Sequence, residues 1–190
     1  MEKKECLCNA IKKIFWGYIF LYFNINLGTI DILPGWIGYI FFYQAIRDGI
    51  AEEEESSKLL QPIGIILGIY NGITWILSIL YIPTNIILVD MLIDVISLYF
   101  HFQLLTNLSN IARKYSCEQE RSLLTLRTIQ TILLTVLAVL VYFEELYEVA
   151  VILLIVQCVV VICLCIVLHK LKQTMDELPE EIFEKNILSD

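Results

Sequence analysis

The residues with the greatest capacity for chemistry lie in one apolar segment, residues 86–105. Asp90, Asp94, Ser97 and His101 follow one another at intervals of four, three and four residues, so a helix would place them on one face. Asp94 lies near the middle of the segment, where a charge facing lipid would be costly. We predict that this face points to protein or water. Asp94 would then bind a cation or exchange a proton, with Asp90 attracting the cation from outside and His101 passing protons further in.

A second polar stripe occurs in the preceding apolar segment, residues 62–82. Asn71, Thr74 and Ser78 share one helical face, and in an antiparallel hairpin Asn71 would reach the depth of Asp94. Further hydroxyl groups come from the segment 123–143: Thr128, Thr131 and Thr135. Two interpretations remain open, because these groups could line a polar pathway or could join helices through interhelical hydrogen bonds.

An acidic patch is expected where the first two apolar segments meet. Asp31 lies in this connection, with Asn24 and Asn26 just before it. Acidic residues also occur in the last outer connection: Glu144, Glu145 and Glu148. These groups would form an outer vestibule that raises the local concentration of cations, unless they are simply hydrated loop charges.

The elements that must position these residues are apolar runs of membrane-spanning character. The chain has 190 residues, of which 58% are hydrophobic, and its mean hydropathy is +0.72. A soluble domain of this size cannot bury so much apolar surface, so lipid must cover part of it. The runs occupy residues of about 14–30, 32–46, 62–82, 86–105, 123–143 and 149–168. We predict a single all-α transmembrane domain of six helices arranged as three helical hairpins.

The basic residues predict the orientation of this domain. All thirteen Lys and Arg residues lie in or beside alternate gaps between the runs, and the gaps around 28–35, 81–85 and 142–148 have none. Because short cytoplasmic loops retain Lys and Arg, we expect both termini in the cytoplasm of a multi-pass protein of the bacterial plasma membrane.

The first hairpin is short for a bilayer. The run 32–46 has fifteen residues, which as a helix would be roughly 22 Å long against a hydrocarbon core of ~30 Å. Pro34 suits the first turn of the second helix, with Asp31 as a nearby cap. We expect the tip of this hairpin to lie within the outer leaflet, or the bilayer to thin around it.

Polar segments follow the even-numbered runs. Residues 51–60 form a hydrophilic linker, and 102–115 and 168–183 continue their runs as amphipathic stretches. In the acidic cytoplasmic tail, residues 170–190, apolar residues recur at helical spacing. We therefore expect an amphipathic helix there, lying on the membrane surface.

Several functional classes are disfavoured. The net charge of −8 argues against nucleic acid as a partner. The sequence has none of the motifs HExxH, GxSxG, GxGxxG or the P-loop, and its two histidines are far apart. We therefore expect no catalytic residues, no metal site and no cofactor, and a protein that is not an enzyme. Its partners would be the lipid bilayer and either a membrane-complex partner or a second copy of the chain.

The stretch 29–43, TIDILPGWIGYIFFY, resembles a segment of small, uncharacterised polytopic membrane proteins of Gram-positive bacteria. Their motif (I/V)D-x-LP-x-(W/F)-x-G-(Y/W) follows the first hydrophobic helix, and the resemblance implies no known activity. The chain is also loosely similar to the six-helix substrate-binding subunits of energy-coupling-factor importers, although it lacks their Gly-Pro and Ala-rich patterns.

Two functions follow as hypotheses. The first is the binding or movement of a small solute or cation through a polar helix interface centred on Asp94. The alternative is an accessory or scaffold subunit of a membrane complex, for example the substrate-binding subunit of an ABC-type importer.

Overall fold

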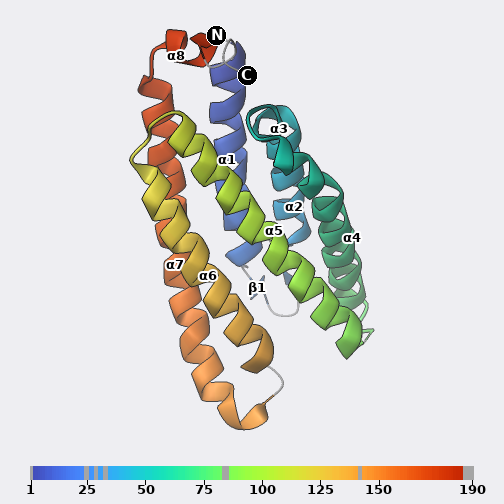
Figure 1. Ribbon diagram of the computed structural model, residues 1–190. Coiled ribbons are helices and arrows are strands. Elements are labelled where there is room, and N and C mark those ends of the chain that lie inside the picture. The colour runs from blue at the N-terminus through green and yellow to red at the C-terminus, as the bar shows by residue number, and fades with distance from the viewer. Residues whose placement is uncertain are drawn as a thin grey trace.

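The fold is a bundle of long helices that run up and down the molecule (Figure 1). The computed structural model describes residues 2–23, 26–27, 30–31, 34–82, 86–140 and 143–185. Both chain termini lie at one end of the bundle (Figure 1), which we call the terminal end; the opposite end is the distal end.

The elements follow one another in simple order along the chain. They are α1 (Glu2–Tyr22), β1 (Asn26–Leu27), β2 (Ile30–Asp31), α2 (Trp36–Ala45), the π-helical turn η1 (Ile46–Ile50), α3 (Ala51–Glu53), η2 (Glu55–Leu59), α4 (Leu60–Ile79), α5 (Ile87–Lys114), α6 (Gln119–Leu140), η3 (Glu144–Leu146), α7 (Tyr147–Glu177) and α8 (Glu180–Lys185). The two strands pair antiparallel, with Asn26 opposite Asp31.

Four helical segments have the length and composition of membrane spans. Within the described residues these are Glu55–Ile79, Ile87–Lys114, Gln119–Leu140 and Tyr147–Glu177. They contain the four longer apolar runs of the sequence almost completely, because each run is long enough to cross a hydrocarbon core as a helix. The chain therefore has the features of an integral membrane protein.

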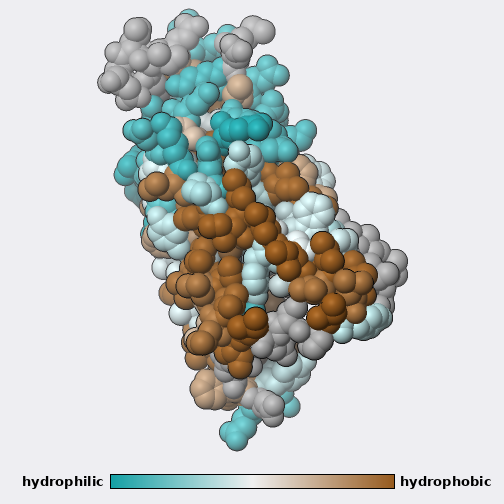
Figure 2. Space-filling model, turned by 90° about the vertical axis from the view of Figure 1, so that its right-hand side faces the viewer, coloured by the Kyte–Doolittle hydropathy of each residue, from teal (hydrophilic) through white to brown (hydrophobic). Residues whose placement is uncertain are grey.

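The surface divides along the length of the bundle. Hydrophilic side chains gather over the terminal end, and hydrophobic ones cover much of the surface below (Figure 2). Large aliphatic side chains on the distal parts of α5 and α7 are exposed, including Leu88, Val95 and Ile155. Exposed apolar surface on this scale is expected of helices surrounded by lipid.

The six longest described helices pack as neighbours in a closed ring. Helix α1 packs against α2 and α7, α2 packs against α4, α5 packs against both α4 and α6, and α6 packs against α7. Helices α1 and α2 approach very closely, since a Cβ atom at Gly38 would lie 2.7 Å from the carbonyl oxygen of Gly17. Only glycine permits this crossing, which holds the first two helices together.

The predicted first hairpin needs correction. The run 14–30 was expected to be helical throughout, but α1 begins at Glu2 and ends at Tyr22, and residues 26–27 pair with 30–31 as short strands. Helix α2 begins at Trp36 rather than at residue 32. The intervening sequence is rich in Asn, Gly, Thr and Asp, which favour turns over helix interiors.

The first two helices extend over only part of the bundle. Tyr22, in the last turn of α1, accepts a hydrogen bond from Gln130 of α6 at 3.1 Å. Gln130 lies ten residues before the end of α6, which corresponds to about 15 Å of helix. Helix α1 therefore ends well short of the distal end, and β1 lies about midway along α6 and α7 (Figure 1).

The polar segments at the terminal end are more helical than expected. The linker 51–60 contains α3, η2 and the start of α4. Residues 170–177 continue α7 directly, with Leu171 and Met175 fully buried in the bundle. The start of the tail is therefore part of the core and not a separate helix on the membrane surface.

Candidate functional site

A cavity of about 560 Å³ lies between α4, α5 and α6, beside the last turn of α1. Its apolar wall is formed by Leu21, Met91, Ile93, Val95, Leu98, Leu134, Leu137, Ala138 and Val139. Its polar lining consists of Tyr22, Tyr39, Tyr70, Asn71, Asp94, Ser97, His101 and Thr135. The cavity thus brings together most of the predicted polar stripe of α5 with one residue of the stripe of α4.

Asp94 is the acidic residue of the cavity wall. Its side chain is exposed, and within the described part of the chain it makes no hydrogen bond or ion pair. Asn71 faces the same cavity and donates its amide to the carbonyl oxygen of Leu67 at 2.8 Å, not to Asp94. The Asp94 carboxylate is therefore available to a ligand.

Asp90 occupies a different position from the one predicted. It does not line the cavity and instead accepts a hydrogen bond from the hydroxyl group of Tyr70, which joins α5 to α4. Tyr70 itself does line the cavity. Asp90 therefore helps to position a cavity residue.

His101 forms the inner end of the cavity. It is only 2% exposed, and neither ring nitrogen has a hydrogen-bond partner among the described residues. Five aromatic rings surround it, with centroid separations between 5.4 and 6.4 Å: Tyr18, Tyr22, Tyr39, Phe42 and Phe100. Such a ring cluster closes the cavity towards the terminal end.

Ser97 connects the cavity wall to α2. Its hydroxyl group lies 3.3 Å from that of Tyr39, which is also in contact with His101. Ser97 and His101 therefore belong to one polar wall at the inner end of the cavity, as their shared helical face predicted.

Sequence reasoning missed Gln157 of α7. Gln130 of α6 donates to the Tyr22 hydroxyl, and Gln157, 1% exposed, lies beside the same hydroxyl group. The Tyr18 hydroxyl has no hydrogen-bond partner among the described residues. Gln157 is the one strongly polar residue inside the most apolar run, and this is the signal that could have found it. Buried polar atoms without partners are costly in lipid.

The other residues of the predicted pathway lie outside the cavity. Thr74 donates to the backbone oxygens of Tyr70 and Asn71, at 3.0 and 3.1 Å, and Ser78 bonds to the oxygen of Trp75 at 2.7 Å. The hydrogen bonds described for these hydroxyl groups are made to the backbone of α4 itself, and neither residue lines the cavity.

The predicted outer vestibule falls largely outside the described structure. Asn24 is outside the described residues, and only the backbone pairing is described for Asn26 and Asp31. Glu145 and Glu148 are exposed. Within the described part of the chain, no three His, Cys, Asp or Glu side chains come together as a metal site would require.

No protein-family model, curated protein or solved structure matches this chain. Its function must therefore be inferred from the cavity itself.

Proposed function

We propose that the four long helices cross the membrane, that α1 and α2 enter it as a short hairpin, and that the chain binds a small solute carrying a positive charge in a cavity open to the outer side. The observation that carries this proposal is the exposed Asp94 carboxylate, which lies in an otherwise mainly apolar cavity without an ionic partner in the described structure. Movement of the same solute across the membrane would use the same site.

The basic residues support a cytoplasmic terminal end. Lys13 of α1 pairs with Asp48 at 2.6 Å, and Arg127 of α6 donates to Thr106 of α5 at 3.0 Å. Lys13 and Arg127 lie nearer to the terminal end than the cavity residues of the same helices, Tyr22 and Leu134, and hydrophilic side chains gather over that end (Figure 2). Under the positive-inside rule this level is the cytoplasmic face, so the cavity lies towards the outer side.

The short first hairpin supports access of water to the cavity. The backbone of β1 and β2 lies at mid-depth of the bundle, beyond the end of α1 (Figure 1). Non-helical backbone at this depth is tolerated only where protein buries it or where it lines a water-filled space. A water-filled cavity between α4, α5 and α6, beside the last turn of α1, would hydrate Asp94 and supply water near this backbone.

The lining identifies the class of solute. A volume of about 560 Å³ is within the range of small-molecule sites, roughly 300–1,000 Å³. Asp94 favours a cationic group, and the faces of Tyr22, Tyr39 and Tyr70 also attract cations. The aliphatic wall favours an apolar body. A small organic amine with an apolar or aromatic portion fits all three features.

Cysteine accessibility tests the open cavity. In right-side-out vesicles, Ser97→Cys is expected to react with a charged, membrane-impermeant methanethiosulfonate reagent. The matched control is Val159→Cys, a residue of α7 that is 54% exposed to the surrounding medium but does not line the cavity. It should stay unlabelled because lipid excludes the charged reagent. Equal labelling of both variants, or of neither above the wild-type background, would contradict an aqueous cavity.

Ligand binding tests the role of Asp94. We expect tyramine or a related aromatic amine to raise the melting temperature of the detergent-purified protein. Asp94→Asn should abolish this shift, Asp94→Glu should retain part of it, and Asp90→Asn should weaken it less. A shift that is unchanged in Asp94→Asn would remove this carboxylate from the site. If a panel of amines and of Na⁺ and K⁺ salts gives no shift at all, the cationic ligand class is wrong.

A further inference from the structure

A second hollow lies on the membrane-facing side of the bundle, separate from the Asp94 cavity in all but one residue. It is a groove of about 460 Å³ between α2 and α4. Its lateral walls include Ile40, Ile65 and Ile69, which are 43%, 45% and 57% exposed. The shared residue is Tyr39, which borders both spaces.

Glycines make this groove deep. Gly64 and Gly68 line it from α4, and they carry no side chain that would fill it. A Cβ atom at Gly68 would lie only 3.3 Å from Cβ of Tyr39, so α4 lies close against α2 at this point. The result is a mainly apolar groove along two helices.

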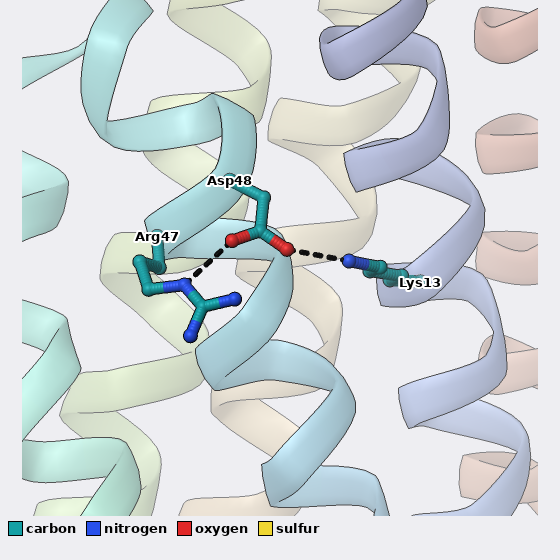
Figure 3. Close-up of polar contacts among 3 residues, drawn as sticks. All are labelled: Lys13, Arg47 and Asp48. Atoms are coloured by element: carbon teal, nitrogen blue, oxygen red, sulfur yellow. Dashed lines mark hydrogen bonds and ion pairs between the residues drawn. The ribbon is translucent and has the colours of Figure 1, made fainter.

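One end of the groove is cationic. Arg47 lies where the groove meets the polar surface, with its side chain 57% exposed and its guanidinium 5.8 Å from the centre of the Tyr43 ring. Asp48 binds Nε of Arg47 and Nζ of Lys13, each at 2.6 Å. Figure 3 shows Nε of Arg47 directed at one carboxylate oxygen of Asp48 and Nζ of Lys13 directed at the other. Two cations share one carboxylate, so the cluster has one positive charge in excess.

We infer that this groove binds an anionic phospholipid of the leaflet nearest the termini, with one acyl chain along Gly64 and Gly68 and the phosphate on Arg47. Charge complementarity selects this occupant, because a partly exposed guanidinium forms strong, charge-assisted hydrogen bonds with phosphate. The lateral position of the groove places it within reach of lipid and away from the outer side.

A protein helix fits these features less well than a lipid does. A helix in the groove would bring its own apolar side chains against Arg47 and would bury the excess charge without a partner, which is costly. A phospholipid provides the apolar chain and the anion in one molecule.

Native mass spectrometry of the full-length protein tests the inference. The probes are phosphatidylglycerol and phosphatidylcholine of identical acyl chains, titrated into the protein in a mild detergent. We expect phosphatidylglycerol to bind about tenfold more tightly, since its headgroup has the phosphate charge without a balancing cation. Equal affinity for the two lipids would overturn the inference.

Two variants locate the site. Arg47→Gln should abolish the preference for phosphatidylglycerol, and Ile69→Trp, which fills the groove, should reduce the binding of both lipids. Their matched controls are Arg113→Gln, an arginine bonded to Asn110 at the terminal end, and Ile73→Trp, a 52% exposed residue of α4 that does not line the groove. Loss of lipid in a control but not in its matched variant would place the lipid elsewhere.

Asp48→Asn separates lipid recognition from folding. This variant removes the carboxylate that Arg47 shares with Lys13 and leaves both cations in place, so phosphatidylglycerol should bind at least as tightly as in the wild type. If Asp48→Asn loses the lipid as Arg47→Gln does, the cluster acts by holding α1 to η1 and the inference fails. A dimer mass with no lipid attached, abolished by Ile69→Trp, would identify a second copy as the occupant instead.

Discussion

The terminal half of the bundle is joined by a network of buried polar contacts. Glu53, whose side chain is 1% exposed, pairs with Lys3 of α1 at 2.9 Å and with Lys114 of α5 at 3.4 Å, and it accepts a hydrogen bond from Tyr115 at 3.0 Å. Asn107 of α5 donates to Ser57 of η2 at 2.6 Å. These contacts connect α1, α3, η2 and α5.

The distal half is built more loosely. Its described polar contacts between helices include those of Tyr70 with Asp90 and Tyr39 with Ser97, and the cavity separates α4 and α5 from α6. Buried hydrophobic residues of α5 begin only at Phe100, and those of α7 only at Val160. The contrast indicates that the terminal half contributes more to the stability of the fold, and the proposed binding site would then lie in the less stable half, as is common for binding regions.

The strongest test of this contrast is the removal of Glu53. Glu53→Ala leaves Lys3 and Lys114 facing each other without a carboxylate, and we expect a loss of about 2–3 kcal/mol of unfolding free energy, reduced somewhat because both lysines are partly exposed. Unfolding in mild detergent would measure it. The control is Glu55→Gln, at an exposed pair with Lys58, which should cost less than about 0.5 kcal/mol. Equal losses of unfolding free energy in the two variants would show that the buried ion pairs stabilise the fold no more than the exposed pair does.

Two glycine substitutions compare the tight α1–α2 crossing with the looser packing of α4. Gly38→Ala introduces a methyl group against the Gly17 backbone, 2.7 Å away, and we expect it to destabilise the fold by about 1–2 kcal/mol. Gly72→Ala meets nothing closer than Trp36 at 3.8 Å and should be nearly neutral. The melting temperatures of the two variants provide the comparison, and a larger loss in Gly72→Ala would show that the distal half is the more tightly packed.

A substitution at Asp94 is expected to raise stability, whereas the substitutions above lower it. Because its carboxylate has no ionic partner in the described structure, Asp94→Asn should raise the stability of the ligand-free protein, by up to ~1 kcal/mol. A melting temperature below that of the wild type would mean that Asp94 stabilises the fold. It would contradict the view that the distal half gives up stability to keep this carboxylate exposed.

The smallest effect is expected at Asp48, outside the membrane spans. Its hydrogen bonds with Arg47 and Lys13 lower the pKa of its carboxyl group below the ordinary value. The folded state therefore gains stability while the carboxylate is ionised, at pH values above the unfolded-state pKa, and loses it as the pH falls through the lowered pKa. Because the side chain is partly exposed, we expect only ~0.5 kcal/mol. Asp48→Asn should lose less stability than the wild type between pH 6 and pH 3; identical pH profiles would contradict this assignment.

The sequence predicted the distal half of the fold well and the terminal half less well. The runs 62–82, 86–105, 123–143 and 149–168 correspond to the four long helices, because continuous apolar composition in lipid leaves little choice but a helix. Helix boundaries at the terminal end depend on burial instead. Leu171 and Met175 extend α7 because they contact other helices, and hydropathy alone does not show which helices those are.

The candidate site was predicted in part. Helical spacing on α5 correctly placed Asp94, Ser97 and His101 on one side, since all three line the cavity. The same spacing placed Asp90 with them, but the hydroxyl group of Tyr70 binds it elsewhere. The partners from other helices, Tyr22, Tyr39 and Gln130, could not be predicted, because their positions depend on how α1, α2 and α6 pack in space.

The composition of helix α7 makes it stiff along its whole length. Its 31 residues contain neither proline nor glycine, so it is about 46 Å of uninterrupted helix with no built-in joint. Helix α1 packs against α7. A rigid-body tilt of α7 would therefore move both of its ends together, since no proline or glycine lets one half of the helix bend independently of the other.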